Sequence, residues 1–207
     1  MTRTADWLSA GWRTVISAPG HFLLLSFLWA LVIGIVSGAT DGALVLLIIG
    51  PARASLYGVV LARVRTGQMD FDRLRVGIDS FIQTMLAGLV IAIFTAAGLA
   101  ILLLPGLLIA SLYLFSILLI IDRGMSFWEA MEESRKKVQQ DLLGFLGFFL
   151  ALVGINLLGL ACFGVGFFLT LPVALAAVSV AYRELWPEEA PAAEQTPPAD
   201  QPQLPQT

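Results

Sequence analysis

The chain has 207 residues, of which 58% are hydrophobic and only 13% charged, and its formal net charge is −3 at pH 7. Soluble domains carry about 25% charged residues, and a soluble fold must keep its surface wetted. This composition therefore excludes an ordinary soluble domain and indicates an integral membrane protein. A single cysteine, Cys162, excludes an internal disulfide, and a single histidine, His21, argues against a zinc or haem site. We expect no metal and no cofactor.

Six apolar runs follow one another along the chain, each close to the roughly 20 residues that a helix needs to cross a bilayer. They are residues 22–38, 43–62, 81–104, 106–121, 142–161 and 164–182. Short turns join the two members of each pair, including a turn at Pro105-Gly106, and longer polar connections separate the pairs. The sequence predicts an all-α fold, a polytopic six-helix transmembrane bundle over residues 1–186. Residues 187–207, rich in Pro, Ala, Gln and Glu, are predicted to be a disordered tail.

The basic residues indicate how the spans are oriented. Eleven of the twelve lie before the first span, in the two long connections or at the end of the last span, and the three short turns contain none. Under the positive-inside rule this distribution predicts that both termini and both long connections are cytoplasmic. A cleaved signal peptide ending near residue 39 is the weaker alternative, because five more spans follow it.

The pairs of spans look like three copies of one unit, an amphipathic segment followed by a helical hairpin. Ala54-Ser55-Leu56-Tyr57 recurs as Ala110-Ser111-Leu112-Tyr113, and the first spans carry small residues at spacings of four. Such residues allow membrane helices to approach closely. The alternative is chance, because Gly, Ala and Leu are common in all spans. Three repeats in the same orientation predict a bundle with approximate threefold symmetry about the membrane normal.

The amphipathic segments place large aromatic side chains beside charged ones. Trp7, Trp12, Phe71 and Trp128 lie on the apolar faces of these segments, at the spacings of three and four that define one helical stripe. We expect these four residues at the membrane interface, where aromatic side chains are common anchors. A collar that binds anionic lipid or a partner protein is the alternative.

Arg53 is the one basic residue inside a predicted span, two positions after Gly50-Pro51. A charge at the middle of a membrane is costly, by at least ~2.5 kcal/mol on insertion scales, so it should face the bundle interior or water. No Asp or Glu lies in any of the six spans. The interior partners that we expect include Asn156, Thr95 and the hydroxyls of Tyr57 and Tyr113. The site binds an anion or a lipid head group, or else Arg53 is structural.

The chain lacks the motifs of the common enzyme classes. It contains no Gly-Lys-Ser/Thr, no HExxH and no serine nucleophile with a histidine and an aspartate nearby. We therefore expect no catalytic residues and no enzyme activity, and the few basic residues in the connections argue against nucleic-acid binding. The leading hypothesis is a membrane scaffold or accessory protein that contacts lipids and a protein partner or a second copy of itself. The alternatives are a transporter or channel for a small anionic or amphiphilic solute that uses Arg53, and a lipid-binding protein.

Several short segments resemble a family of uncharacterised bacterial inner-membrane proteins with many spans. These proteins are similar to the membrane domain attached to some glycerophosphodiester phosphodiesterases. The segments are Gly50-Pro51, residues 63–67, residues 122–130 with Ser134 following, Pro172 and Ala181-Tyr182. The resemblance implies a location in the bacterial cytoplasmic membrane. The catalytic domain has no counterpart in this sequence, so the resemblance implies no activity.

Overall fold

A computed structural model describes residues 3–40, 42, 44–162, 164 and 166–187. The described chain is all-α, with six spans long and apolar enough to cross a membrane, as the sequence predicts. The tail predicted to be disordered lies, from residue 188 on, outside the described residues. The helices are α1 (Thr4–Ile16), α2 (Pro19–Ala39), α3 (Val45–Thr66), η1 (Phe71–Arg75), α4 (Val76–Asp79), α5 (Phe81–Ile101), α6 (Leu103–Leu112), α7 (Ser116–Arg123), α8 (Phe127–Gln139), α9 (Leu142–Ala161) and α10 (Phe167–Leu185).

The spans form an inner and an outer set. The first spans of the three hairpins are α2, α5 and α9. The buried share of their most apolar window is only 17%, 17% and 22%, respectively. The corresponding fractions are 56%, 44% and 50% for the second spans, which are α3, the pair α6–α7, and α10. The second spans therefore surround the centre, and the first spans face outward along most of their length.

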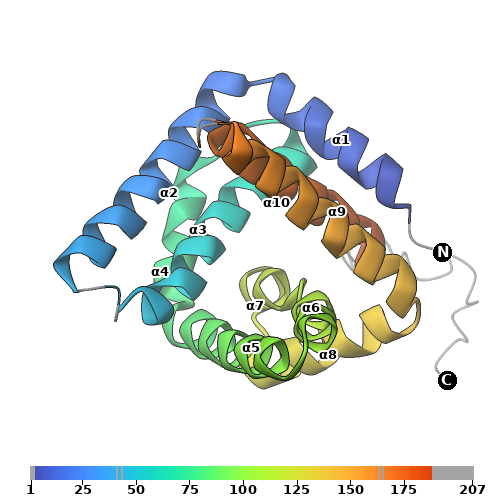
Figure 1. The fold of residues 1–207 in the computed structure, drawn as a ribbon. Helices are drawn as coiled ribbons and strands as arrows, with labels where there is room; N and C mark the ends of the chain where they lie inside the picture. The colour runs from blue at the N-terminus through green and yellow to red at the C-terminus, as the bar shows by residue number, and fades with distance from the viewer. Residues whose placement is uncertain (1–2, 41, 43, 163, 165, 188–207) are drawn as a thin grey trace, which may run out of the picture.

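The three units pack in a closed ring. The inner helix α3 contacts η1, α4 and α5 of the second unit, α6 and α7 contact α8 and α9 of the third, and α10 contacts α1 and α2 of the first. Figure 1 shows the resulting three-sided arrangement, with both ends of the described chain on one side of it. Each unit thus packs on the next in the same sense, as three repeats would. We call the end that carries α1, η1, α4 and α8 the base, and the end with the short turns the hairpin end.

The turn between α5 and α6 differs from the sequence prediction. The chain leaves the helix at Leu102, whose backbone is extended (φ −160°, ψ 148°), and α6 begins at Leu103. Pro105 therefore lies in the first turn of α6, where its missing N–H removes no helical hydrogen bond. Gly106 does not form the turn. It packs against Gly98 of α5, where a Cβ added to Gly98 would lie 2.8 Å from the Gly106 Cα.

The fourth span is broken, which the sequence did not predict. α6 ends at Leu112 and α7 begins at Ser116, so the break leaves buried backbone groups without helical partners. Ser134 of α8 bonds to both sides of it. Its hydroxyl donates to the Leu112 carbonyl (2.8 Å) and accepts from the Phe115 N–H (3.3 Å). The fully buried Ser134 side chain thereby fixes the base helix to the broken span.

Only some of the small residues mediate close helix packing. A Cβ on Gly50 would lie 2.1 Å from the Thr84 carbonyl oxygen, so α3 and α5 meet backbone to backbone there. Gly88 of α5 approaches Gly50 from the other side, and a Cβ added to Gly88 would lie 3.0 Å from the Gly50 Cα. Gly34 and Gly147, by contrast, have no such neighbour within 4 Å. Of the periodic small residues, Gly88 of α5 therefore lies at a close helix interface, whereas Gly34 of α2 and Gly147 of α9 do not.

One of the four residues expected at the membrane interface lies in the core instead. Trp7 is 2% exposed, packs against Phe145 and Phe148, and donates from Nε1 to Glu184 (2.7 Å). Its face of α1 is covered by α10, the helix that closes the ring. Trp12, Phe71 and Trp128 are 46%, 39% and 60% exposed at the base. Their exposure leaves them free to contact lipid. Their role at the membrane interface stays a prediction.

Candidate functional site

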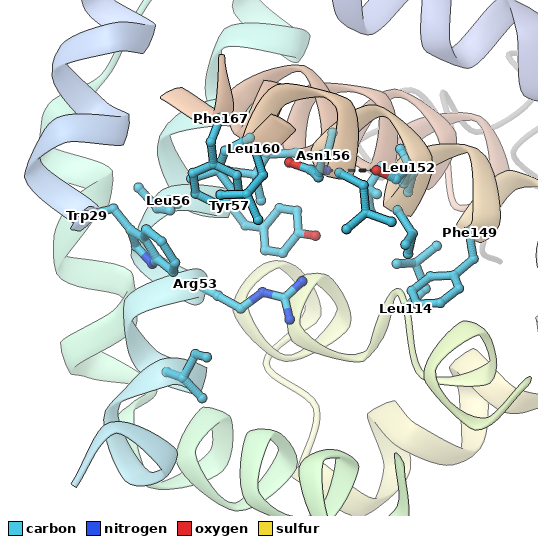
Figure 2. Close-up of a pocket in the computed structure, with 17 residues that line it drawn as sticks. Trp29, Arg53, Leu56, Tyr57, Leu114, Phe149, Leu152, Asn156, Leu160 and Phe167 are labelled. Atoms are coloured by element: carbon cyan, nitrogen blue, oxygen red, sulfur yellow. Dashed lines mark hydrogen bonds between the residues drawn. The ribbon is translucent and has the colours of Figure 1, made fainter. Parts of the chain in front are cut away.

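Two cavities lie in the half of the bundle nearer the hairpin end, which we call the hairpin half. They meet at Arg53. Cavity A, of about 380 Å³, is bounded by α2, α3, α9 and α10, and cavity B, of about 390 Å³, by α3, α5, α6 and the start of α7. Five residues line both: Ile49, Arg53, Tyr57, Leu114 and Phe149. Each volume falls in the ~300–1,000 Å³ range of pockets that bind small molecules. Figure 2 shows Arg53 and Tyr57 reaching from α3 into the same space.

Arg53 enters this space from within the membrane-spanning part of α3. It lies eight residues after Val45, or about 12 Å along the helix at 1.5 Å per residue. Its side chain is exposed to the cavities, and among the described residues no carboxylate or carbonyl bonds to its guanidinium. Among the described residues, Arg53 is also the one charged residue that lines either cavity. An intramembrane charge without a protein partner is a candidate ligand-binding group.

The other predicted site residues lie around the same space. Tyr57 lines both cavities, Asn156 lines cavity A, and Tyr113 lines cavity B. The Asn156 amide is already bonded, since its Nδ2 donates to the Leu152 carbonyl (2.8 Å) and its Oδ1 accepts from Thr170 (3.4 Å). The structure shows no bond from it to Arg53, the partner that the sequence suggested. The structure brings the four predicted residues together, but it shows no bond between Arg53 and the other three.

Two residues that line the cavities each carry a buried polar atom with no hydrogen-bond partner among the described residues. They are Trp29 of cavity A, with its Nε1, and Thr95 of cavity B, with its Oγ1. An unpaired buried polar group costs about 1–3 kcal/mol, so each is a candidate contact for a ligand. Trp29 was not among the residues predicted from the sequence to line the site. Its position was the available signal, because a tryptophan ten residues into α2 lies far from the interfaces where this residue is usually found.

The remaining walls of both cavities are apolar. In cavity A, Leu157 and Leu160 of α9 line the space and are largely exposed on the outer surface. In cavity B, Leu99 of α5 occupies a similar position. In the part of the chain that the structure describes, no charged side chain other than Arg53 lines either cavity, so apolar material enters at lower cost than a hydrated ion.

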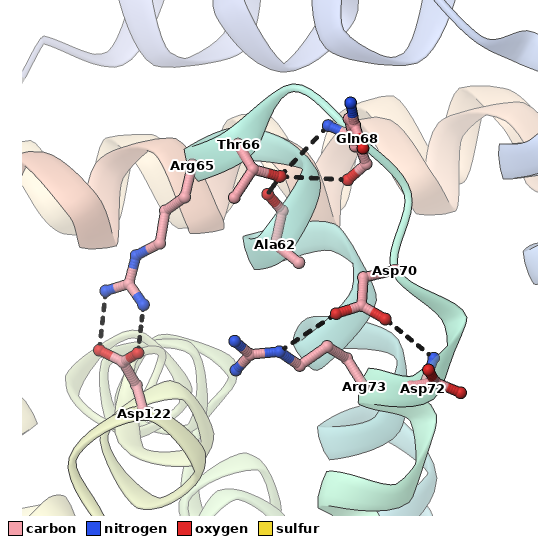
Figure 3. A network of polar contacts seen from close by, with 8 residues as sticks. All are labelled: Ala62, Arg65, Thr66, Gln68, Asp70, Asp72, Arg73 and Asp122. Atoms are coloured by element: carbon pink, nitrogen blue, oxygen red, sulfur yellow. Dashed lines mark hydrogen bonds and ion pairs between the residues drawn. The ribbon is translucent and has the colours of Figure 1, made fainter.

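A polar triad joins the three inner helices at the base. Arg65 at the end of α3 forms a two-point ion pair with Asp122 at the end of α7, with Nη2 2.9 Å from Oδ2. Tyr182 near the end of α10 donates its hydroxyl to the same Oδ2 (2.7 Å). The side chains of Arg65 and Asp122 are only 17% and 14% exposed. Figure 3 shows the Arg65–Asp122 pair beside the chain that follows α3.

Aromatic rings close the base next to this triad. Tyr182 stacks on Trp186 with ring centroids 5.3 Å apart, and Phe115 packs on Trp186 at 5.4 Å. Phe115 also meets Phe145 edge to face at 5.8 Å, and Phe145 stacks on Trp7 at 6.0 Å. These contacts join all three units. The cavities around Arg53 are therefore closed off toward the base.

Two carboxylates of the base helix α8 carry shifted pKa values. Hydrogen bonds from the Ser126 side chain and backbone lower the pKa of Glu129, which completes a capping box at the start of α8. A hydrogen bond from Arg135 lowers the pKa of Glu132. Glu129 is exposed and the Glu132 side chain is 35% exposed, and each has a local partner. Their shifts therefore reflect helix capping and a surface ion pair and give no sign of a reactive group.

The resemblance noted in the sequence converges on the triad. Residues 63–67 contain Arg65, residues 122–130 begin with Asp122, and Ala181-Tyr182 supplies the hydroxyl. These three segments meet at a structural junction between inner helices, whereas Gly50 of the segment Gly50-Pro51 lines cavity B. No family model matches the chain, and neither a curated protein nor a solved structure is significantly similar to it. The named resemblance accordingly stays a prediction.

Proposed function

We propose that this multi-pass membrane protein binds an anionic amphiphile, with the acidic group at Arg53 and the apolar part in the adjoining cavities. The observation that carries the proposal is the position of Arg53, which projects between two apolar cavities and bonds to no described residue. A guanidinium presents several N–H donors in a plane and pairs with carboxylate or phosphate oxygens at two points. An anionic ligand would supply the partner that the bundle does not.

The apolar walls favour an amphiphile over a small hydrophilic anion. A hydrated anion would lose its water on entering cavities lined by one charge and mostly by Leu, Ile, Phe and Ala side chains. An amphiphile already in the bilayer can move in past exposed apolar residues such as Leu157 and Leu160. It would bury its chain without leaving an apolar environment.

We propose that both termini face the cytoplasm, and that the membrane is a bacterial cytoplasmic membrane. The orientation is supported by the eleven basic residues outside the spans. The bacterial location rests on the sequence resemblance alone. Modification of single-cysteine variants at Arg75 and at Thr40, in a Cys162→Ala background, tests the orientation. A reagent that does not cross the membrane should label only position 40 in intact cells.

Native mass spectrometry of the full chain in a neutral detergent tests the proposed ligand. The probes are oleoyl lysophosphatidate, which is anionic, and oleoyl lysophosphatidylcholine, which has the same chain and no net charge. We expect the anionic probe to bind at one site with higher affinity. Arg53→Gln should weaken it by about 10- to 100-fold, because hydrogen bonds to charged groups contribute about 1.5–3 kcal/mol.

The matched control is Arg75→Gln, since Arg75 is exposed at the base and lines neither cavity. It should leave binding unchanged. Equal affinity of Arg53→Gln and wild type would overturn the proposal. A scaffold role would then be favoured if a protein partner crosslinks to the base. A transport role would be favoured if substitution of Arg53 alters solute flux into liposomes.

A further inference from the structure

The two cavities differ in direction but not in size, and this constrains the ligand. We infer that the ligand is an anionic glycerolipid with two ester-linked acyl chains, one in each cavity and the head group between them at Arg53. This inference rests on the proposed function and names the chemistry of its ligand. It draws on the paired cavities and on the two unpaired polar atoms of Trp29 and Thr95.

The cavities diverge from a shared middle. Cavity A continues from Arg53 toward Leu157 and Phe167, between α2, α9 and α10, whereas cavity B continues toward Ile91 and Leu99 of α5. Their volumes are about 380 and 390 Å³. A ligand with a single chain would fill one cavity and leave the other, of equal size and similar lining, empty. Two chains joined at one anionic head group would fill both.

Each cavity also offers one hydrogen-bond donor that no described residue uses. The Trp29 indole N–H can only donate, and the Thr95 hydroxyl can donate as well. Both atoms are buried, and they belong to residues that line the cavities, Trp29 in cavity A and Thr95 in cavity B. The carbonyl oxygen of an acyl ester is an acceptor without charge, positioned where a chain joins its head group. Two ester-linked chains would bring one such acceptor to each cavity.

The charge balance of the site fits the same ligand. Arg53 supplies a single positive charge, and Tyr57, which lines both cavities with it, adds a neutral hydroxyl donor. One phosphate ester can accept from the guanidinium at two oxygens and leave a further oxygen for a hydroxyl. A zwitterionic head group would bring a cation, for which the described residues of the cavity linings provide no carboxylate.

Competition between two probes tests the inference on the full chain in neutral detergent. The probes are dioleoyl phosphatidate, with two chains, and oleoyl lysophosphatidate, with one. We expect one bound phosphatidate per protein and an affinity at least tenfold higher than that of the lysolipid. Arg53→Gln should weaken both probes.

Conservative variants test the two donors. Trp29→Phe retains an aromatic ring and removes the N–H, and Thr95→Val retains the shape and removes the hydroxyl. Each should weaken phosphatidate by about three- to tenfold, and together they should weaken it more than either alone. The controls are Trp12→Phe on the exposed face of α1 and Thr14→Val, whose hydroxyl is bonded to the Ala10 carbonyl. Both controls should bind as the wild type does.

The outcomes separate this inference from the proposed function. If the lysolipid binds as tightly as phosphatidate and Arg53→Gln weakens both, the anionic site stands and the two-chain ligand is wrong. Normal phosphatidate binding by the Trp29→Phe, Thr95→Val double variant also overturns the two-chain assignment. If neither probe depends on Arg53, the proposed function itself is wrong.

Discussion

The base and the hairpin half of this bundle are built from the same inner helices but are packed in opposite ways. In α3, the residues from Leu56 to Ala62 are all buried, whereas Arg53, one turn earlier, is exposed to two cavities. At the base the inner helices are joined by the Arg65–Asp122–Tyr182 triad and by aromatic rings. The hairpin half has no comparable cross-link among its described residues. The difference indicates that the base supplies stability and leaves the hairpin half free to hold a ligand.

Truncation of one leucine in each half should give the largest difference between them. Leu118 of α7 is fully buried at the base, and Leu157 of α9 borders cavity A and is largely exposed. Leu118→Ala should lower the free energy of unfolding by about 2–5 kcal/mol, and Leu157→Ala by less than about 0.5 kcal/mol. Chemical denaturation in mild detergent measures both. Similar losses would show that the hairpin half is packed as tightly as the base.

Loss of the Asp122 charge tests the triad. Asp122→Asn keeps the shape but leaves the guanidinium of Arg65 without its carboxylate, and removing one partner of a buried pair costs about 3 kcal/mol. The free energy of unfolding should fall by this amount. The control is Asp72→Asn, because the Asp72 side chain is exposed. If the two variants unfold alike, the triad does not hold the inner helices together.

Two glycines in the hairpin half compare a close helix contact with an open helix face. Gly50 borders cavity B, yet its other side touches the backbone of Thr84, so Gly50→Ala should cost about 1–3 kcal/mol. Gly34 faces outward on α2 with no atom within 4 Å of an added Cβ. Gly34→Ala should therefore be neutral or stabilising, by up to ~1 kcal/mol from helix propensity. Equal destabilisation by both would place a tight contact on α2 that the structure lacks.

The smallest expected effect is a pH dependence of the base. The folded-state pKa of Glu129 lies below its ordinary value of 4.5, because Ser126 bonds to the carboxylate. The folded state therefore favours the ionised form. Its contribution to stability is present above the unfolded pKa and is lost as the pH falls through the lower folded value. Between about pH 5 and pH 3 the wild type should lose more stability than Glu129→Gln. Parallel pH curves would contradict the capping contribution of this carboxylate.

The sequence predicted the spans well because their signal is local and strong. Length and apolarity are properties of consecutive residues, so all six spans were found. The turn at Leu102 was missed, because Pro105 is as compatible with a first helical turn as with a break. Local patterns also placed Trp7 at the interface, although the long-range closure of the ring buries it.

The candidate site was only partly predictable. An arginine inside an apolar span is conspicuous, and it pointed to the correct region of the bundle. The unpaired atoms of Trp29 and Thr95, and the triad at the base, depend on contacts between distant segments. Asp122 and Tyr182 are 60 positions apart, so spacing within one helix gives no sign that they meet.

Photo-crosslinking with a lipid tests the central claim, that the hairpin half holds an anionic lipid at Arg53, most directly. The protein is incubated with a phosphatidate analogue that carries a diazirine in one acyl chain, and the complex is irradiated. The adducts are then mapped by peptide sequencing. We predict adducts on residues that line the cavities, such as Ile91 and Val153, and their loss in Arg53→Gln. Adducts confined to outward-facing residues such as Leu31 and Ile35, or unchanged in Arg53→Gln, would contradict the account.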